Sequence, residues 1–347
     1  MRNKLVRNQN PRNIYWKIIE SEPSLRYHEG EDVAAWQKKA CAKLWELLGL
    51  DLIEKCDPDF LIESKTETDE YNEIRFSFQT EEGYYAPAVI RIPKGLKGKI
   101  APMICLQGHT KGMHISLGQP KYPDDEETIR SGDRDFAVHA FNNGYAPVVL
   151  EQRYMGECGG SENGPGCHPS PTRPGGLSAM PTLMTGRTAI GERVWDISRL
   201  IDLLEKEFPE LDCDSVYCMG ESGGATATFY AACIEERIKA AIPCCAVCTY
   251  LDSIVAMMHC ACNYVPSISR YFDMGDLAGL VAPRVLVVVS GDADPIFPIE
   301  GAKKSVELAR NVYRALDCED KLAHVIGNGG HRFYAADTYS VFNKLVK

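Results

Sequence analysis

Apolar residues recur along this chain in short runs, and in its later part these runs alternate with stretches long enough to be helices. Runs of four to eight apolar or alternating residues predict strands, whereas an apolar spacing of three or four predicts helices. Because strands that alternate with helices form layered α/β folds, we predict a mostly parallel eight-stranded sheet with helices on both faces. The predicted strands are residues 71–80, 84–93, 103–106, 146–150, 216–219, 240–246, 284–290 and 322–326.

Two segments show helical periodicity with one apolar face. Residues 188–207 predict a helix whose apolar stripe faces the core, at Val194, Ile197, Ile201 and Leu204. The segment of residues 1–70 contains a second predicted helix, which ends at Gly49. Its apolar face consists of Val33, Trp36, Ala40, Leu44, Leu47 and Leu48. Since this segment is too short to bury a core alone, we interpret it as a helical extension packed on a main domain at residues 71–347.

A glycine-rich sequence, Gly220-Glu221-Ser222-Gly223-Gly224, lies between the predicted strand at 216–219 and a stretch of small residues compatible with a helix. This context is typical of a nucleophile elbow, in which serine takes a strained backbone conformation and glycines avoid clashes in the sharp turn. The following helix directs its free N–H groups and the positive end of its dipole at the same point. Ser222 is therefore a candidate nucleophile, and an acid and a histidine are expected to follow it along the chain.

Suitable partners follow in that order. Asp292 and Asp294 come directly after the predicted strand at 284–290, and His331 lies on a glycine-rich loop after the strand at 322–326. Because catalytic groups in parallel sheets collect at the carboxyl ends of strands, we expect these residues to meet Ser222. Serine needs a base that accepts its proton, imidazole titrates near neutral pH, and a carboxylate fixes the imidazole tautomer. The prediction is a triad of Ser222, His331 and Asp294, with Asp292 as the alternative acid and Asp252 as a third candidate.

These motifs resemble those of α/β-hydrolases, most closely the dienelactone hydrolase and acetyl xylan esterase (cephalosporin-C deacetylase) group, from about residue 70 to the end. In that group the acid lies in a G-x-x-D pattern before a proline, which matches Gly291, Asp294 and Pro298 and favours Asp294 over Asp292. The group also has an H-G-x motif after its third strand. Here the sequence is Gln107-Gly108-His109, so the usual histidine is replaced by glutamine, which puts the support of this loop in doubt. The resemblance implies an oxyanion hole formed by the backbone N–H groups of Gly223 and His109.

The resemblance also implies an activity. We expect a serine hydrolase that cleaves carboxylic esters through an acyl-enzyme, with short-acyl, acetyl-type esters of carbohydrates or other small polar alcohols as substrates and no cofactor. Two alternatives stay open: a peptide hydrolase similar to oligopeptidases, and a non-catalytic binding protein on the same fold. Residues 156–185 are rich in Gly, Pro and Ser and leave the sheet near the predicted site. A loop insertion of this length is usually functional or disordered, and we expect it to shape the substrate pocket.

Composition narrows the possible partners. The chain has 347 residues and a formal net charge of -10, which argues against nucleic acid or an anionic membrane surface as a general partner. No apolar run approaches the length of a membrane span, and no apolar segment of a secretory signal follows the polar first residues. We therefore expect a cytoplasmic protein that binds a small-molecule ester. An oligomer is compatible with the sequence but is not predicted by it.

Cysteine is unusually frequent, with 14 residues. Close groups of cysteine and histidine can bind zinc, but the spacings here match no simple zinc motif. We expect reduced thiols that serve as small apolar packing residues, and no metal. The groups are Cys244, Cys245 and Cys248, then His259, Cys260 and Cys262, and in the insertion Cys158, Cys167 and His168.

Overall fold

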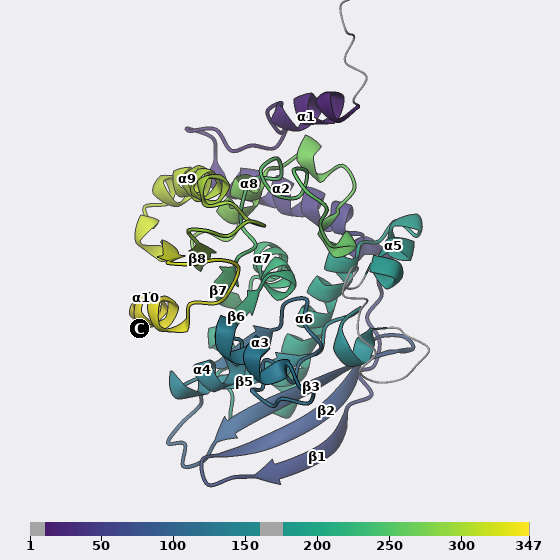
Figure 1. Cartoon of the computed structure of the whole chain (residues 1–347), viewed down its shortest axis with the longest axis vertical. Coiled ribbons are helices and arrows are strands. Elements are labelled where there is room, and N and C mark those ends of the chain that lie inside the picture. Colours follow the sequence, from purple (N-terminus) through teal and green to yellow (C-terminus); the bar gives the residue numbers. More distant parts are fainter. Residues whose placement is uncertain (1–10, 160–175, 347) are drawn as a thin grey trace, which may run out of the picture.

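The computed structural model describes residues 11–159 and 176–346. Its centre is a nine-stranded sheet with the strand order β1-β2-β3-β5-β4-β6-β7-β8-β9 (Figure 1). Each of the eight predicted strands is present, so the α/β prediction is confirmed. The strands are β1 (Leu61–Glu67), β2 (Tyr71–Glu81), β3 (Tyr84–Pro93), β4 (Pro102–Leu106), β5 (Ala146–Leu150), β6 (Val216–Glu221), β7 (Ile238–Cys244), β8 (Val285–Gly291) and β9 (Leu322–Gly327).

The predicted number of eight strands was wrong, because β1 adds a ninth at the edge of the sheet. This strand pairs antiparallel with β2, and all seven of its residues are exposed. Its sequence, Leu-Ile-Glu-Ser-Lys-Thr-Glu, is mostly polar, since an edge strand with no covered face needs no apolar side. The last part of residues 1–70, which we had assigned to a helical extension, therefore belongs to the sheet.

The sheet is mixed, with antiparallel pairs at one end and parallel pairs in the rest. The pairs β1–β2, β2–β3 and β3–β5 are antiparallel. All pairs from β5 through β4, β6, β7 and β8 to β9 are parallel. The carboxyl ends of six parallel strands consequently lie along one edge, where the loops after β4, β6, β8 and β9 carry the predicted site residues.

Helices cover both faces of the sheet, as predicted. Residues of α2, α6, α7, α8 and α9 share one buried apolar cluster with one face of the strands. Residues of α4 and α10 share a second cluster with the other face. The helices are α1 (Arg12–Glu20), α2 (Val33–Leu48), α3 (Asp125–Gly132), α4 (Phe136–Asn142), α5 (Gly176–Met184), α6 (Ala189–Glu207), α7 (Gly223–Ile234), α8 (Met274–Gly279), α9 (Ile299–Ala315) and α10 (Ala335–Leu345).

The two helices predicted from periodicity are present. Helix α2 begins after Asp32, whose side chain accepts a hydrogen bond from the Ala35 backbone, and it ends at Gly49 in the left-handed conformation. Its buried face belongs to the same apolar cluster as the core of the sheet. In α6 the stripe of Val194, Ile197, Ile201 and Leu204 is buried, as expected. Helix α1 was not predicted.

The predicted insertion at residues 156–185 contains regular structure in its described parts. A short 3-10 turn spans Gly156–Cys158, and α5 forms the end of the segment. Helix α5 packs near a second 3-10 turn, Ala261–Asn263, where Ala179 and Cys262 share a small buried cluster. Cys167 and His168 lie outside the described residues. Within residues 11–159 and 176–346, no helix has both the length and the apolarity needed to cross a membrane.

Candidate active site

Ser222 occupies a sharp turn between β6 and α7. Its backbone angles are φ 54° and ψ -118°, a conformation that costs energy for any residue with a side chain. The glycines on either side have no room for a side chain. A Cβ atom on Gly224 would lie 2.1 Å from the carbonyl oxygen of Leu106, and one on Gly220 would lie 2.5 Å from the Gly224 carbonyl carbon. The turn thus has the geometry of a nucleophile elbow.

The other two predicted triad residues are in contact with each other. The Nδ1 atom of His331 lies 2.8 Å from Oδ2 of Asp294. The Asp294 side chain is fully buried, and its Oδ1 accepts hydrogen bonds from the backbone N–H groups of Ile296 and Phe297. These bonds fix the carboxylate in an orientation that holds the imidazole, with Nε2 left for a reacting group.

The two alternative acids have other partners. Asp292 is exposed and accepts a hydrogen bond from the Gly329 backbone, so it supports the loop that carries His331. Asp252 bonds to Thr249 and forms an ion pair with Lys304. Neither carboxylate is hydrogen-bonded to the His331 ring.

Opposing influences act on the pKa of His331. Burial lowers the pKa of the imidazole, but hydrogen bonds with Asp294 and Cys245, together with the charge of Glu221, outweigh burial and raise the pKa to about 10. Burial in turn raises the pKa of Asp294, but the hydrogen bond with His331 outweighs this and holds the pKa below its usual value. Asp294 is therefore ionised at neutral pH and stabilises a proton on the imidazole.

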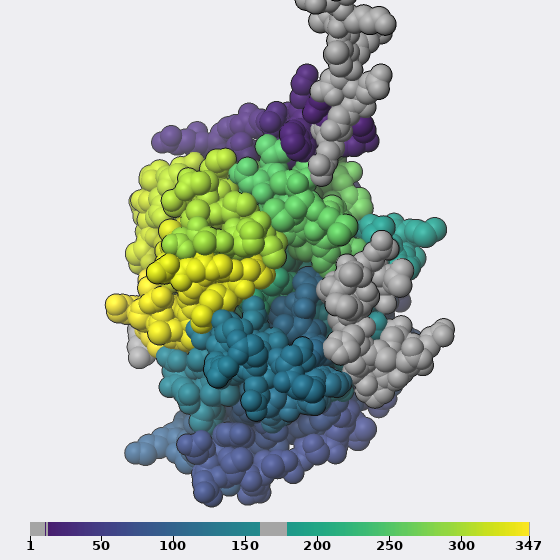
Figure 2. All heavy atoms as spheres, in the orientation of Figure 1, coloured from purple at the N-terminus to yellow at the C-terminus, as the bar shows by residue number. Residues whose placement is uncertain are grey.

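Ser222 and His331 open onto the same cavity, which has a volume of about 920 Å³. The loops after β4, β6, β8 and β9 contribute to its wall, together with α5 and the segment around residues 258–264. Figure 2 shows the blue segment around α3, the green segment before α8 and the yellow C-terminal residues meeting on one face. The lining residues are His109, Thr110, Arg134, Met180, Leu183, Glu221, Ser222, Gly223, Thr226, Met258, His259, Cys260, Ala261, Asn263, Tyr264, Ile296, Phe297 and His331.

The loop Gln107-Gly108-His109 after β4 lies directly against the elbow. A Cβ atom on Gly108 would be 3.3 Å from Cβ of Ser222. A Cβ atom on Gly223 would be 2.4 Å from Cε1 of His109, so the His109 imidazole covers the Gly223 backbone. Both predicted oxyanion-hole residues are therefore beside Ser222.

A buried network supports this loop, and no pattern in the sequence predicts it. The side-chain amide of Gln107 donates to Glu151, and Gln152 donates to the Gln107 carbonyl at 2.7 Å. Glu151 also accepts a hydrogen bond from the backbone of Met113 at 3.0 Å. Burial raises the pKa of Glu151 to about 8. The glutamine that replaces the usual histidine is thus itself held in place at both its side chain and its carbonyl.

Sequence reasoning also missed Arg134, which lies between α3 and α4. Its guanidinium forms two hydrogen bonds with Glu221, at 2.9 and 3.0 Å, and a third with the carbonyl of His331 at 3.2 Å. Glu221 is the residue before Ser222, and its acidic side chain at a buried strand end was the one available signal. No pattern in the sequence distinguishes Arg134 from other arginines.

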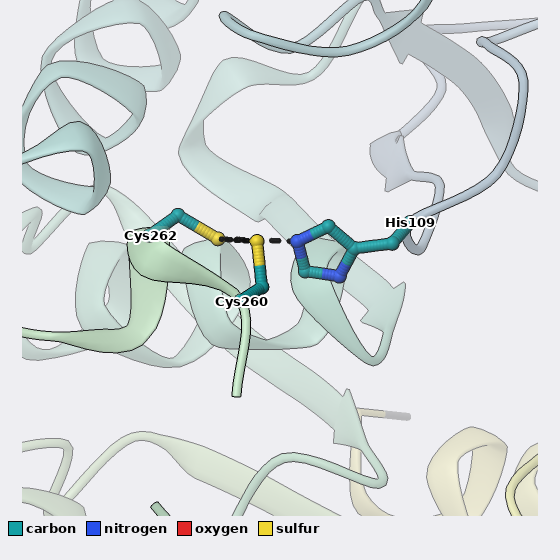
Figure 3. Close-up of side chains that lie close together, drawn as sticks. All are labelled: His109, Cys260 and Cys262. Atoms are coloured by element: carbon teal, nitrogen blue, oxygen red, sulfur yellow. Dashed lines mark hydrogen bonds between the residues drawn. The ribbon is translucent and has the colours of Figure 1, made fainter. Parts of the chain in front are cut away.

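Two groups of side chains among the described residues have the composition and proximity to hold a metal ion. Cys245, Asp294 and His331 form the first group, which belongs to the candidate active site. His109, Cys260 and Cys262 form the second (Figure 3). The sequence suggested His259 as the partner of these two cysteines, but the His259 ring instead lies 3.1 Å from the hydroxyl of Ser253.

Comparisons with known proteins agree with this architecture. No protein-family profile matches the chain. A Bacillus subtilis (strain 168) protein named "Putative hydrolase YtaP" is 26% identical over 155 residues, which cover 43% of this chain and 50% of that relative. The match thus spans half the length of the relative.

Solved structures match over nearly the whole chain. A structure described as a "putative acetyl xylan esterase" from Bacteroides fragilis has a TM-score of 0.76 and 14% identity, and covers 97% of this chain and 89% of its own. A glucuronoyl esterase from Solibacter usitatus has a TM-score of 0.67 and 15% identity, with 94% and 97% covered. With the mostly parallel sheet and the nucleophile elbow, these matches show that the chain has the α/β-hydrolase fold.

Proposed function

We propose that this protein hydrolyses carboxylic esters, with Ser222 as nucleophile, His331 as general base and Asp294 as the residue that orients His331. The main support for this activity is the arrangement of the three side chains. Ser222, in a strained elbow, opens onto the same cavity as His331, whose far ring nitrogen is bound to a buried carboxylate 2.8 Å away. A strained conformation is retained at functional sites, where the surrounding structure enforces it.

The proposed reaction has two steps. Oγ of Ser222 attacks the ester carbonyl while Nε2 of His331 accepts its proton, and the proton is then given to the leaving alcohol. Water hydrolyses the acyl-enzyme with His331 again as the base. The backbone N–H groups of Gly223 and His109 stabilise the negative oxygen of each tetrahedral intermediate.

We propose short-acyl esters of carbohydrates or other small polar alcohols as substrates. The support is the fold, shared with proteins described as acetyl xylan and glucuronoyl esterases, and the cavity beside Ser222. At about 920 Å³, the cavity is at the upper end of the range for small-molecule sites, so a sugar-sized alcohol and a short acyl group fit together.

The test is covalent labelling followed by substrate assay. A fluorophosphonate probe should modify Ser222, as mapped by peptide mass spectrometry, and Ser222→Ala should abolish the labelling. Acetylated sugars and p-nitrophenyl acetate should be hydrolysed by the wild type and not by this variant. A folded protein that reacts with no probe would support a non-catalytic binding role, whereas cleavage of peptides in preference to esters would support the peptide-hydrolase alternative.

A further inference from the structure

His109, Cys260 and Cys262 are brought together at the wall of the cavity, which His109 and Cys260 line, although His109 and Cys262 are 153 positions apart. The Nε2 atom of His109 lies 3.1 Å from Sγ of Cys262, and the two sulfur atoms are 3.2 Å apart. All three potential ligand atoms lie within 4.8 Å of one another. In Figure 3 the imidazole and both thiols point toward one another.

We propose that these three residues form a binding site for a thiophilic divalent metal ion, with zinc as the best fit. Zinc binds cysteine sulfur at about 2.3 Å and histidine nitrogen at about 2.0 Å in tetrahedral geometry, so two of its ligand atoms are roughly 3.5 to 3.8 Å apart. The N–S and S–S separations of 3.1 and 3.2 Å are about half an ångström shorter than these values. An opening of the cluster by about that amount accommodates the ion.

Arg193 places a buried positive charge near the two cysteines. Arg193 is almost fully buried, and its guanidinium donates to the carbonyl of Arg153, with Nη1 unpaired. Among the described residues, no carboxylate forms an ion pair with this arginine. A buried cation without a counterion is unfavourable, so it attracts a negative group. Thiolates bound to the ion would supply that negative charge.

Three structural features hold the ligand residues in place. Cys260 and Cys262 flank Ala261 at the start of a 3-10 turn, which presents both sulfurs to the same point. This turn is attached to α7 by the hydrogen bond from Thr226 to Asn263, at 3.1 Å. His109 comes from the loop after β4, and its ring rests on Gly223. Because these supports hold the three ligand residues close together, little conformational entropy is lost on binding.

The donor set indicates the class of ion. Two thiolates and one imidazole suit zinc, and they disfavour magnesium or calcium, which require oxygen ligands. Three protein ligands leave a fourth tetrahedral position, and His109 and Cys260 both line the cavity, so water from the cavity fills that position. The site is distinct from the proposed triad, but it shares the cavity with it.

The direct test is zinc binding by the reduced, chelator-treated full chain, measured in competition with a chromogenic chelator. We expect one equivalent to bind tightly. Cys260→Ser, Cys262→Ser and His109→Ala should each weaken binding by at least about tenfold. His259→Asn is the matched control, because His259 is adjacent in sequence to Cys260 and should not matter. Equal affinity in all variants, or a loss caused by His259→Asn and not by His109→Ala, would overturn the proposal.

A second measurement needs no variant. Zinc should protect Cys260 of the wild type, the more accessible of the two thiols, from alkylation by iodoacetamide, as mapped by mass spectrometry, while Cys56 reacts at an unchanged rate. Cobalt should give a thiolate-to-metal charge-transfer band. Ser222→Ala should bind zinc as the wild type does, which separates this proposal from the proposed hydrolase activity. Absence of protection and of the band, or formation of only a Cys260–Cys262 disulfide under these conditions, would refute the site.

Discussion

Arg134 connects Glu221 to the His331 loop: its guanidinium binds both oxygens of the Glu221 carboxylate and also donates to the backbone carbonyl of His331. Glu221 immediately precedes Ser222, so one side chain links the turn that contains Ser222 to the loop that contains His331. The Glu221 carboxylate is 2% exposed and the Arg134 guanidinium 17%, so this pair is largely shielded from water. Its geometry therefore bears on the spacing of Ser222 and His331.

Replacement of Arg134 by lysine should reduce kcat more than it changes KM. Lysine keeps the positive charge, but it cannot bind both carboxylate oxygens and the His331 carbonyl in the same planar arrangement. We expect kcat to fall by roughly tenfold to a hundredfold, because small misplacements of catalytic groups have large effects on rate. Arg130→Lys is the control, since Arg130 pairs with Glu127 on the exposed side of α3. Equal kinetics for the two variants would show that Arg134 has no positioning role.

Substitution of the two neighbouring carboxylates should separate their roles. Asp294→Asn should lower kcat by about three to four orders of magnitude, because asparagine favours the wrong imidazole tautomer. Asp292→Asn should be far milder, since Asp292 bonds only to the loop backbone at Gly329. Ser222→Ala gives the activity that remains without the proposed nucleophile. The assignment of Asp294 would be lost if the Asp292 variant were the slower of the two.

The parts of this structure that the sequence predicted are those with local signals. Helix α2 was predicted from its apolar face and from Gly49 at its end. The buried strands were predicted from continuous apolar runs. The elbow could be predicted from five consecutive residues. Its glycines are required because a side chain on Gly220 or Gly224 would clash with the backbone of Leu106 at the end of β4. Similarly, the pattern around Asp294 pointed to the carboxylate that lies on His331.

The parts that escaped prediction depend on contacts between distant segments. Strand β1 has no buried face, so its sequence carries no alternation. The Gln107–Glu151 contact joins residues 44 positions apart, and the bond from Arg134 to the His331 carbonyl spans 197 positions. His109 meets Cys262 only because the loop after β4 and the turn at Ala261–Asn263 lie on the same cavity wall. Such pairs have no fixed spacing that a sequence pattern could reveal.

The pH dependence of activity should depend on Cys245. The proposed mechanism needs neutral His331, so with the raised pKa of His331 we expect activity to be low at acidic pH and to rise as the imidazole loses its proton. The hydrogen bond with Cys245 is one of the contributions that raise this pKa, so Cys245→Ala, which removes it, should move the rising limb of kcat/KM to lower pH, by on the order of one unit. Cys218→Ala, in the strand before the elbow, should leave the limb unmoved. A shift to higher pH would contradict the proposed contact.

Stability should also depend on pH through Glu151. Burial raises the pKa of this carboxyl from 4.5 to about 8, so the folded protein holds a proton that the unfolded chain releases. The resulting stabilisation is present below pH 4.5 and is lost as the pH rises through about 8. Glu151→Gln leaves only one oxygen to accept a hydrogen bond but removes the titration, so it should flatten the fall of the unfolding free energy in this window, as measured by urea denaturation. Exposed Glu127→Gln should leave that fall unchanged, and an equally steep fall in the Glu151 variant would rule out a buried, protonated Glu151.

The length of the acyl group should limit the activity of the proposed esterase. Each methylene that a pocket buries contributes about 0.8 kcal/mol, so an enzyme with a long apolar acyl tunnel becomes more active as the chain lengthens. A short pocket gives no such gain and adds steric cost. In a series of p-nitrophenyl esters, kcat/KM should therefore peak between acetyl and butyryl and fall steeply by octanoyl, with Ser222→Ala as the background control. A value that still rises at octanoyl would indicate a lipase-like tunnel, and short-acyl carbohydrate esters would then no longer be the proposed substrates.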